Sequence, residues 1–231
     1  MARSVVLLLS GGIGTRLGGN IPKQYMEVNG RMVIDYCMER LLSCNYVAGL
    51  WIVAAEDWRF QITDACRNKD AILGFSEPGS SRTGSIINGL RDMTVCTDPD
   101  DFVIIHDAAR PMVSRNLLDR CIRACTDCDG VMPVLPMKDT VYYATADGTR
   151  VESLLDRDRV FAGQAPEVFK YGKYKDVLLA LSPAQILAVR GSSEPAIQAG
   201  LDIRMVTGEE SNYKITTPAD LDRFWMEEGR R

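Results

Sequence analysis

The sequence predicts an α/β fold, in which a Rossmann-like, mostly parallel sheet carries helices on both faces. Three features predict it. Short runs of branched apolar residues recur along the chain, segments with helical periodicity separate them, and a glycine-rich loop directly follows the first run. Ligands of such folds bind beyond the carboxyl ends of the strands, so we expect the functional site at that edge.

The apolar runs are interpreted as strands buried on both faces of the sheet. They are Val5–Leu9, Leu50–Ala54, Phe102–Ile105 and Val131–Leu135. Apolar residues spaced three and four positions apart predict helices between and after these strands. The predicted helices are Met32–Leu42, Ser85–Met93, Ser114–Cys125 and Asp220–Met226.

One segment does not fit this alternation. Thr140–Tyr143 favours a strand, Asp147-Gly148 is a strong hairpin signal, and Thr149–Val151 can form the returning strand. We therefore predict that residues 138–159 form a protruding β-hairpin arm within a single domain spanning residues 1–231. Because a lone two-stranded hairpin is marginal in water, we expect the arm to pack on something, and a second subunit is a candidate.

Composition excludes several classes of function. The chain has 231 residues, with 27 Lys plus Arg against 31 Asp plus Glu, so its formal net charge is −4. This balance argues against broad binding to nucleic acid or to an anionic membrane. No apolar run is long enough to cross a membrane. We do not interpret the amino-terminal run as a signal peptide, because Gly11–Gly14 continue it into a different motif.

The seven cysteines indicate a reducing compartment. An odd count without an export signal is typical of a cytoplasmic protein with free thiols. Cys121, Cys125 and Cys128 form the one cluster, and their spacings of four and three are those of a single helix face. A metal or redox site is the alternative. It is disfavoured because no second pair matches and the single histidine, His106, lies at the end of a strand.

The loop that begins at Ser10 is the strongest candidate for a binding site. Its glycines allow close approach of a ligand, and successive amides in such a loop form a nest for phosphate oxygens. Arg16 adds a planar charge suited to phosphate, and Lys23 in the sequence PKQY adds a second cation. No Walker sequence is present, and Leu17 replaces the third glycine of the dinucleotide fingerprint. A phosphate loop is therefore favoured over a plain structural turn.

A carboxylate follows the predicted strand Phe102–Ile105, in the sequence HDAARP. Asp107 there would lie near the first loop and could hold Mg²⁺ beside a polyphosphate, although a loop or helix-cap role is the alternative. Arg110 could bind an anionic acceptor or pair with an acid. His106 is interpreted as a structural hydrogen-bonding residue, not as a base.

Two further polar segments are ambiguous on their own. The stretch from Pro78 to Ser85 could bind the edge of a nucleobase, but on its own a simple capped loop is the favoured interpretation. Lys214 precedes Thr217, Pro218 and Asp220, which together predict the start of a helix and not a ligand site.

These segments together resemble the bacterial cytidylyltransferases that act on polyol phosphates, either 2-C-methyl-D-erythritol 4-phosphate or D-ribitol 5-phosphate. The first loop with PKQY alone would indicate only the wider nucleotidyltransferase superfamily, whereas the HDAARP and NYKITTP segments are much more specific. The resemblance covers nearly the whole chain in family order, and its segments are GGIGTRLG with PKQY, SSRTGS, IHDAARP, KDT, DRDRVFAGQAPEVF and NYKITTPADL.

The resemblance implies a fold of the nucleotide-diphospho-sugar transferase type and a homodimer whose arm reaches the neighbouring site. It also implies that CMP passes from CTP to the phosphate or phosphonate of a small acceptor, with Mg²⁺ present and pyrophosphate released. A phosphomonoester is mostly dianionic at neutral pH, so this reaction needs positioning and positive charge but no general base.

By position, the resemblance assigns roles to single residues. The catalytic cations would be Arg16, Lys23 and Lys214. The acceptor would be bound by Arg110 together with Thr140 and Arg157 from the arm. Asp107 would hold the metal ion. The nucleotide would be bound by Ser10, Gly11, Gly12, Ile13, Gly14, Thr15, Gly79, Arg82, Ser85 and Asp107.

Three positions depart from the family. Ala165 stands where a threonine usually contacts the acceptor, residues 190–195 lack the expected Thr-Asp or Ser-Asp pair, and Ser211 replaces a frequent acid. We therefore hypothesise that the acceptor is a variant, such as a phosphonate or another polyol phosphate. Three different functions compete with this one: a nucleotidyltransferase for another NTP or a sugar 1-phosphate, a non-catalytic nucleotide-binding protein, and a nicotinamide dehydrogenase.

Overall fold

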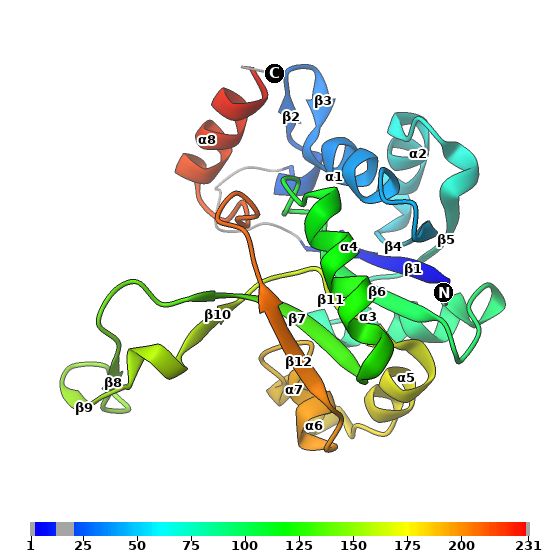
Figure 1. Cartoon of the computed structure of the whole chain (residues 1–231). Coiled ribbons are helices and arrows are strands. Elements are labelled where there is room, and N and C mark those ends of the chain that lie inside the picture. The colour runs from blue at the N-terminus through cyan, green and yellow to red at the C-terminus, as the bar shows by residue number, and fades with distance from the viewer. Residues whose placement is uncertain (1–2, 13–20, 230–231) are drawn as a thin grey trace.

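The structure is a computed structural model that describes residues 3–12 and 21–229. A mixed eight-stranded sheet runs through its centre in the order β10-β7-β11-β6-β1-β4-β5, with β12 beside β7 (Figure 1). Its strands are β1 Ser4–Leu9, β4 Val47–Val53, β5 Ile72–Ser76, β6 Phe102–Asp107, β7 Gly130–Pro136, β10 Phe161–Gly163, β11 Glu167–Lys170 and β12 Ile203–Thr207.

The register of β1 sets the position of the site. β1 pairs in parallel with both β4 and β6, and Leu9 lies opposite Val53 on one side and Asp107 on the other. The first loop and the acidic loop therefore leave the sheet at the same edge. β11 runs antiparallel between β6 and β7. The four predicted strands are present, whereas β5, β10, β11 and β12 were not predicted from the sequence.

Helices cover both faces of the sheet, as predicted (Figure 1). Alternate side chains of β1 point to opposite faces. Val6 and Leu8 pack with α1, α2 and α4, while Val5 and Leu7 pack with α3 and α5. The helices are α1 Val33–Leu42, α2 Glu56–Ala65, α3 Arg82–Asp92, α4 Arg115–Ala124, α5 Tyr171–Leu179, α6 Pro183–Ala188, α7 Glu194–Gln198 and α8 Pro218–Glu228.

A third apolar cluster fixes the segment that carries Lys214. Phe224 of α8 packs edge-on against Tyr36 of α1, with ring centroids 5.2 Å apart. Ile215 is fully buried in the same cluster. Beside it, the short strands β2 Glu27–Val28 and β3 Arg31–Met32 form a hairpin whose turn residues, Asn29 and Gly30, have positive φ. The residue next to Lys214 is thereby anchored to the body of the protein.

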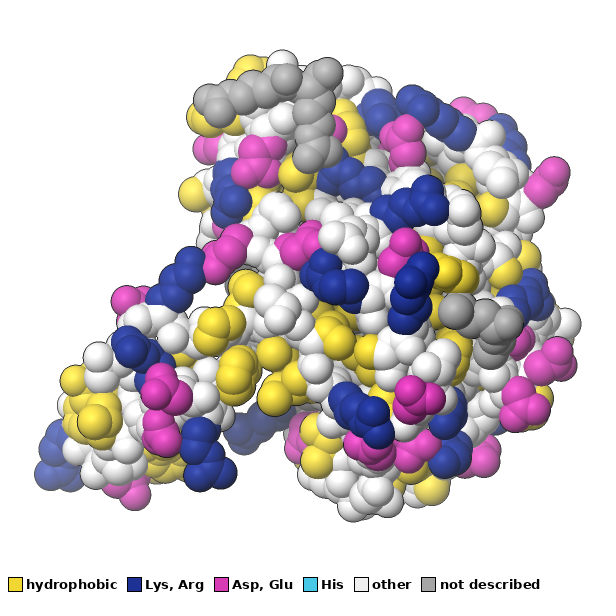
Figure 2. Space-filling model, viewed as in Figure 1, with side chains coloured by type: hydrophobic (Ala, Val, Ile, Leu, Met, Phe, Trp, Pro, Cys, Tyr) yellow, Lys and Arg dark blue, Asp and Glu magenta, His cyan; other side chains and the backbone are white. Residues whose placement is uncertain are grey.

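A second hairpin projects away from the sheet (Figure 1). It consists of β8 Tyr142–Ala144 and β9 Val151–Leu154, which pair with each other. The Asp147 carboxylate accepts hydrogen bonds from Thr149, and Gly148 has a φ of 69°. Its apolar side chains remain 57–65% exposed, namely those of Tyr142, Tyr143, Val151 and Leu154. Figure 2 shows hydrophobic side chains on the hairpin and at its base.

All seven cysteines are free thiols. Cys121 lies in α4, Cys125 and Cys128 follow the end of that helix, and all three are buried. Burial raises the pKa of Cys121 to about 12. Residues 3–12 and 21–229 contain no helix that could cross a membrane.

Candidate functional site

The first loop is held in place from the segment that follows it. Gln24 donates from Nε2 to the carbonyl oxygens of Ser10 and Gly12, at 2.6 and 2.7 Å. The hydroxyls of Ser10 and Tyr25 lie 2.8 Å apart. Gln24 and Tyr25 follow Lys23 in a short 3₁₀ helix, so the same turn that fixes the loop also carries the predicted cation. Neither Gln24 nor Tyr25 was predicted from the sequence to support the loop.

The remaining predicted residues of this loop lie outside the described residues. They are Ile13, Gly14, Thr15 and Arg16. Gly11 packs so tightly that a Cβ there would lie 2.6 Å from the Pro78 ring, whereas a Cβ on Gly12 would meet none of the described residues within 4 Å. The loop is therefore closed on the side of Pro78.

The segment from Gly79 to Ser85 forms the amino terminus of α3. The Ser81 hydroxyl caps the helix by accepting from the Gly84 amide, and the Ser85 hydroxyl accepts from the Gly79 amide at 3.0 Å. A Cβ on Gly79 would lie 2.5 Å from the Gly84 backbone, so this position requires glycine. The capped loop predicted from the sequence is thus present. The positive end of the helix dipole faces the same edge of the sheet.

Three cations meet one carboxylate at the end of β6. Arg82 Nε lies 3.2 Å from Asp107 Oδ1, and Lys214 Nζ lies 2.8 Å from Oδ2. Arg110 Nε is 3.9 Å from Oδ2. We call these four residues the Asp107 cluster. They come from the start of α3, the end of β6, the loop after β6 and the loop before α8, and the fold alone brings them together.

The cluster carries excess positive charge. Burial would raise the pKa of Asp107, but the charges of Arg82, Lys214 and Arg110 outweigh burial and lower the pKa well below its usual range. Asp107 is therefore ionised at neutral pH. The buried carboxylate of Glu167 in β11 also acts on Arg82 and Arg110. Two carboxylates still do not balance three cations, so the cluster suits a polyanion such as a triphosphate.

Arg110 is held partly by backbone. Its Nη1 donates to the Asn212 carbonyl at 2.9 Å, while its buried Nε has no hydrogen-bond partner among the described residues. The Ile215 amide donates to the Ala109 carbonyl at 2.8 Å, which ties the Lys214 segment to the HDAARP loop. Of the two roles expected for Arg110, the structure shows the one beside an acid, at 3.9 Å from Asp107, and the acceptor role stays a prediction.

His106 is fully buried beside Asp107. Desolvation lowers the pKa of its imidazole to about 4, and Nε2 lies 3.1 Å from the Arg110 carbonyl oxygen. A neutral ring that donates to a carbonyl supports the loop and has no exposed nitrogen for a substrate. This geometry is that of a structural hydrogen-bonding residue.

Two residues of this region, Ser192 and Glu167, were not predicted from the sequence. Arg82 Nη1 donates to the Ser192 hydroxyl at 2.9 Å, and the Ser192 hydroxyl donates to the buried carboxylate of Glu167. Ser192 lies in the stretch that departs from the family pattern. The one signal in the sequence was an acid in an otherwise apolar strand, EVF, where burial requires a partner.

Thr140 and Arg157 lie apart from the Asp107 cluster. Both are exposed, and Arg157 donates to the Lys138 carbonyl at 3.1 Å. Within residues 3–12 and 21–229, no hydrogen bond or ion pair joins either residue to the cluster. One copy of the chain therefore does not unite the two groups of predicted acceptor residues.

Asp107 fits a hard divalent cation in part. Mg²⁺ in nucleotide sites takes one or two carboxylates, and substrate phosphates complete its coordination. Asp107 supplies carboxylate oxygens at the predicted position, but both are engaged by cations in this structure. The described residues contain no group of three or more His, Cys, Asp or Glu placed to hold a metal ion. A cation there would need the nucleotide's own oxygens.

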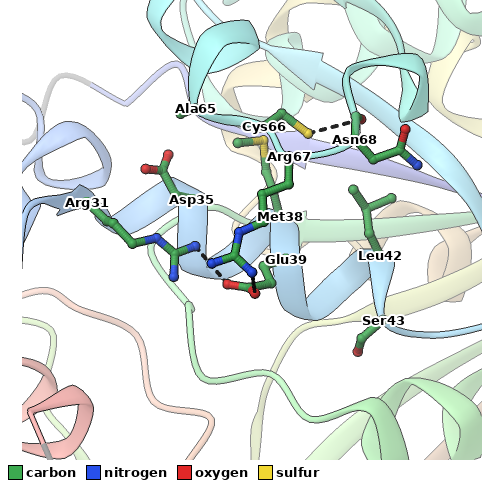
Figure 3. Close-up of a pocket in the computed structure, with 10 residues that line it drawn as sticks. All are labelled: Arg31, Asp35, Met38, Glu39, Leu42, Ser43, Ala65, Cys66, Arg67 and Asn68. Carbon is green, nitrogen blue, oxygen red and sulfur yellow. Dashed lines mark hydrogen bonds and ion pairs between the residues drawn. The ribbon is translucent and has the colours of Figure 1, made fainter. Parts of the chain in front are cut away.

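A second hollow, of about 220 Å³, lies between α1 and the end of α2. Figure 3 shows that the guanidinium groups of Arg31 and Arg67 both turn to Glu39, and each is paired with it, at 2.7 and 2.6 Å. The cations of this hollow are thus balanced by a carboxylate. The Asp107 cluster, with its excess charge, is the better anion site.

Comparison with known proteins agrees with the family resemblance inferred from the sequence motifs. A sequence profile described as IspD, 2-C-methyl-D-erythritol 4-phosphate cytidylyltransferase, matches residues 4–226. A cytidylyltransferase of that name from Rubrobacter xylanophilus is 34% identical over 224 residues, which are 96% of this chain and 93% of that protein. Another from Pseudomonas aeruginosa is 34% identical over 220 residues, 92% of this chain and 91% of that protein.

The fold agrees as well. The crystal structure of 4-diphosphocytidyl-2C-methyl-D-erythritol synthase from Anaerococcus prevotii superposes with a TM-score of 0.80 at 24% identity, over 100% of this chain and 99% of that one. The resemblance inferred from the sequence motifs is thereby confirmed. The chain belongs to the 2-C-methyl-D-erythritol 4-phosphate cytidylyltransferase family, and it is a cytidylyltransferase.

Proposed function

We propose that this chain transfers CMP from CTP to the phosphate of 2-C-methyl-D-erythritol 4-phosphate or a closely related acceptor, and releases pyrophosphate. One observation carries the proposal. Arg82, Arg110 and Lys214 converge on Asp107 at the edge of the sheet where the glycine loop begins. The names of the relatives supply the substrate, and the excess positive charge suits the triphosphate.

The nucleotide would lie between the first loop and the start of α3. Gly11, Gly12 and the Ser10 backbone would face the triphosphate, together with Ile13, Gly14, Thr15 and Arg16. None of the described residues lies within 4 Å of a Cβ built on Gly12, which supports this placement. Gly79, Ser85 and the backbone of Arg82 would lie at the cytosine end, while the Arg82 guanidinium reaches Asp107. The Ser85 hydroxyl accepts from Gly79 and keeps its own proton free to donate.

The reaction would proceed by in-line displacement at the α-phosphorus. An oxygen of the acceptor phosphate forms a bond to phosphorus, the bond to the β-phosphate oxygen breaks, and pyrophosphate leaves with that electron pair. Lys23, Arg16 and Lys214 would stabilise the charge that develops. A divalent cation, Mg²⁺ in our proposal, would neutralise phosphate charge beside Asp107. The burial and lowered pKa of His106 agree with a reaction that needs no base.

The acceptor would be bound at a site shared between two copies. Arg110 would contribute from one copy, and Thr140 and Arg157 from the arm of the other, residues 138–159. Two observations support a homodimer. The hairpin exposes apolar side chains. Among the described residues, Thr140 and Arg157 form no hydrogen bond or ion pair with the Asp107 cluster of their own chain. A second copy would cover the former and bring the latter to the site.

The departures from the family pattern bear on the choice of acceptor. Ala165 offers no hydroxyl, and Ser211 is exposed. In the stretch 190–195, however, Ser192 places a hydroxyl against Arg82 at 2.9 Å. A polyol phosphate therefore remains the first candidate, and a phosphonate of similar size is the second. We also propose a cytoplasmic location, which seven free thiols support.

The test is pyrophosphate release with each of the four NTPs, Mg²⁺ and a panel of acceptors. The panel holds 2-C-methyl-D-erythritol 4-phosphate, ribitol 5-phosphate, glycerol phosphate, sugar 1-phosphates and simple phosphonates. We expect release with CTP and one polyol phosphate. Turnover with a phosphonate alone would favour the second candidate, and the absence of CTP binding by calorimetry would overturn the proposal.

A further inference from the structure

Glu167 is a buried carboxylate outside the residues assigned above. It begins β11, opposite Ile105 of β6, and it is 8% exposed next to the fully buried Val168. Its Oε1 accepts the Ser192 hydroxyl proton, and its Oε2 has no hydrogen-bond partner among the described residues. Burying a carboxylate costs free energy unless the group is hydrogen-bonded. We therefore look for the role of Glu167 in the other contacts of its hydrogen-bond partner, Ser192.

Ser192 lies between Glu167 and Arg82, and it donates one hydrogen bond and accepts the other. A serine hydroxyl has one proton to donate. Because Ser192 donates that proton to Glu167, its lone pairs face Arg82, and Arg82 Nη1 donates to Oγ at 2.9 Å. The backbone of Ser192 is fixed independently, since the fully buried Tyr174 of α5 donates to its carbonyl at 2.9 Å. Ser192 is thus a rigid bridge between Glu167 and Arg82.

Arg82 depends on this bridge for its orientation. The side chain is 37% exposed, and within the described residues its guanidinium hydrogen-bonds to two residues, Ser192 and Asp107. The charge of Glu167 also acts on it. A long side chain held at Asp107 alone could swing about that one contact, whereas two contacts on different nitrogens fix the plane of the guanidinium. The same Asp107 also holds Lys214, so a turn of Arg82 would disturb the cluster.

We propose that Glu167 is a positioning residue which, through Ser192, holds the guanidinium of Arg82 against Asp107 in the orientation that receives CTP. The inference rests on the proposed function for its ligand, but the orientation of Arg82 is a property of the unliganded protein. The two parts can therefore be tested separately.

The first experiment needs no substrate. Arginine Nε–Hε resonances are recorded by NMR, and the Arg82 signal is identified by its loss in Arg82→Ala. We expect a distinct, sharp Arg82 resonance that broadens or moves to the position of solvent-exposed arginines in Glu167→Ala and in Ser192→Ala. An unchanged resonance in both variants would overturn the positioning role.

Asp35 supplies the matched control. It is also 8% exposed, one oxygen accepts from the Met32 amide, and the other has no hydrogen-bond partner among the described residues. It lies at the hollow between α1 and α2 (Figure 3), and Arg82 is not among the residues that line this hollow. Asp35→Ala should leave the Arg82 resonance unchanged, and a similar change in this variant would show a general loss of packing and overturn the assignment.

The second experiment links the orientation to the ligand. CTP affinity is measured by calorimetry with Mg²⁺ and without acceptor. We expect Glu167→Ala to weaken CTP binding by about tenfold, Glu167→Gln to stay within about threefold because its amide oxygen still accepts from Ser192, and Glu167→Ala to have no further effect in an Arg82→Ala background.

The outcomes separate the two proposals. A wild-type protein that does not bind CTP would sink the proposed function and leave the NMR result to decide the role of Glu167. Normal CTP affinity in Glu167→Ala, or additive losses in the double variant, would overturn the positioning role while the proposed function stands.

Discussion

The Asp107 cluster and the β8–β9 hairpin differ in how far one chain completes them. The cluster draws four side chains from distant segments into contact, and each charged group there has a partner within its own chain. The hairpin carries two of the predicted acceptor residues, yet its apolar side chains face solvent and Arg157 contacts nearby backbone. The first region is complete within one chain, whereas the second leaves its apolar side chains uncovered.

This difference has a physical basis. The cluster lies where parallel strands end. The pairing of β1 with β4 and β6 places Leu9 level with Val53 and Asp107, so the strands end side by side. The hairpin is stabilised by one strand pair and its turn, and such a unit buries little apolar surface. A second copy would supply that burial, so assembly and acceptor binding would be coupled.

The largest effect is expected at the cluster. Lys214→Ala should lower kcat by about 10²–10³-fold, because a cation beside the reacting phosphate is lost. The fold should survive, since Asp107 keeps Arg82 and Arg110 as partners. Steady-state kinetics measure kcat, and the thermal unfolding midpoint measures the stability of the fold.

Lys173→Ala is the control. It removes a similar ammonium–carboxylate pair, with Asp129 at 2.7 Å, and should leave kcat unchanged. Equal losses in both variants would contradict the role of Lys214.

The next largest effect is expected on the pH dependence of stability, and it comes from His106 beside the Asp107 cluster. Desolvation lowers the pKa of His106 from 6.5 to about 4. The unfolded state therefore binds more protons in this window, and the free energy of unfolding should fall as pH drops from 6.5 toward 4. The contribution is roughly 3 kcal/mol.

His106→Gln isolates this contribution, because it keeps a donor for the Arg110 carbonyl and His106 is the one histidine of the chain. Denaturant unfolding at several pH values should show a shallower slope in His106→Gln than in the wild type. Asp147→Asn in the hairpin should keep the wild-type slope between pH 6.5 and 4. Identical slopes in the wild type and His106→Gln would mean that the imidazole titrates normally.

A smaller effect is expected at the hairpin. Leu154 is 64% exposed in one chain, so Leu154→Ser should hardly change the stability of a monomer. If a second copy covers it, the substitution should weaken the dimer by about tenfold, which sedimentation across a range of concentrations would measure. Leu187→Ser on α6, where the side chain is 70% exposed, is the control and should not alter association. A wild-type monomer at all concentrations would refute the shared site.

The same contrast explains which parts of the fold the sequence predicts. β1 and β6 are continuous branched runs, so both faces are buried and the pattern is unambiguous. β11 and β12 mix charged and apolar residues, because β11 begins with the buried Glu167 and β12 is a half-exposed strand beside β7. Short strands of this kind are recognised by their neighbours and not by their own sequence.

The site divides in a similar way. Asp107 was predictable because it lies at the carboxyl end of a buried strand. The Gly79 loop was predictable because serine caps and glycine turns have local rules. Ser192 and Glu167 were not predictable, since the bond between them spans 25 residues and depends on how β11 inserts beside β6. The conformation of the loops follows from nearby residues, whereas hydrogen bonds between distant residues depend on how the strands and helices pack.

The shared acceptor site is tested most directly by mixing two impaired variants. Arg157→Ala should raise the KM for the acceptor by about tenfold or more with little change in CTP affinity, because the lost guanidinium would contact only the acceptor. Lys214→Ala disables the cluster instead. In a mixed dimer, one site would combine an intact cluster from one chain with an intact arm from the other.

Co-folded Arg157→Ala and Lys214→Ala chains should therefore recover roughly a quarter of wild-type activity at acceptor concentrations below KM, because half of randomly mixed dimers are heterodimers with one complete site each. Activity no higher than the average of the two separate variants would contradict the account, since it would mean that each chain uses its own arm.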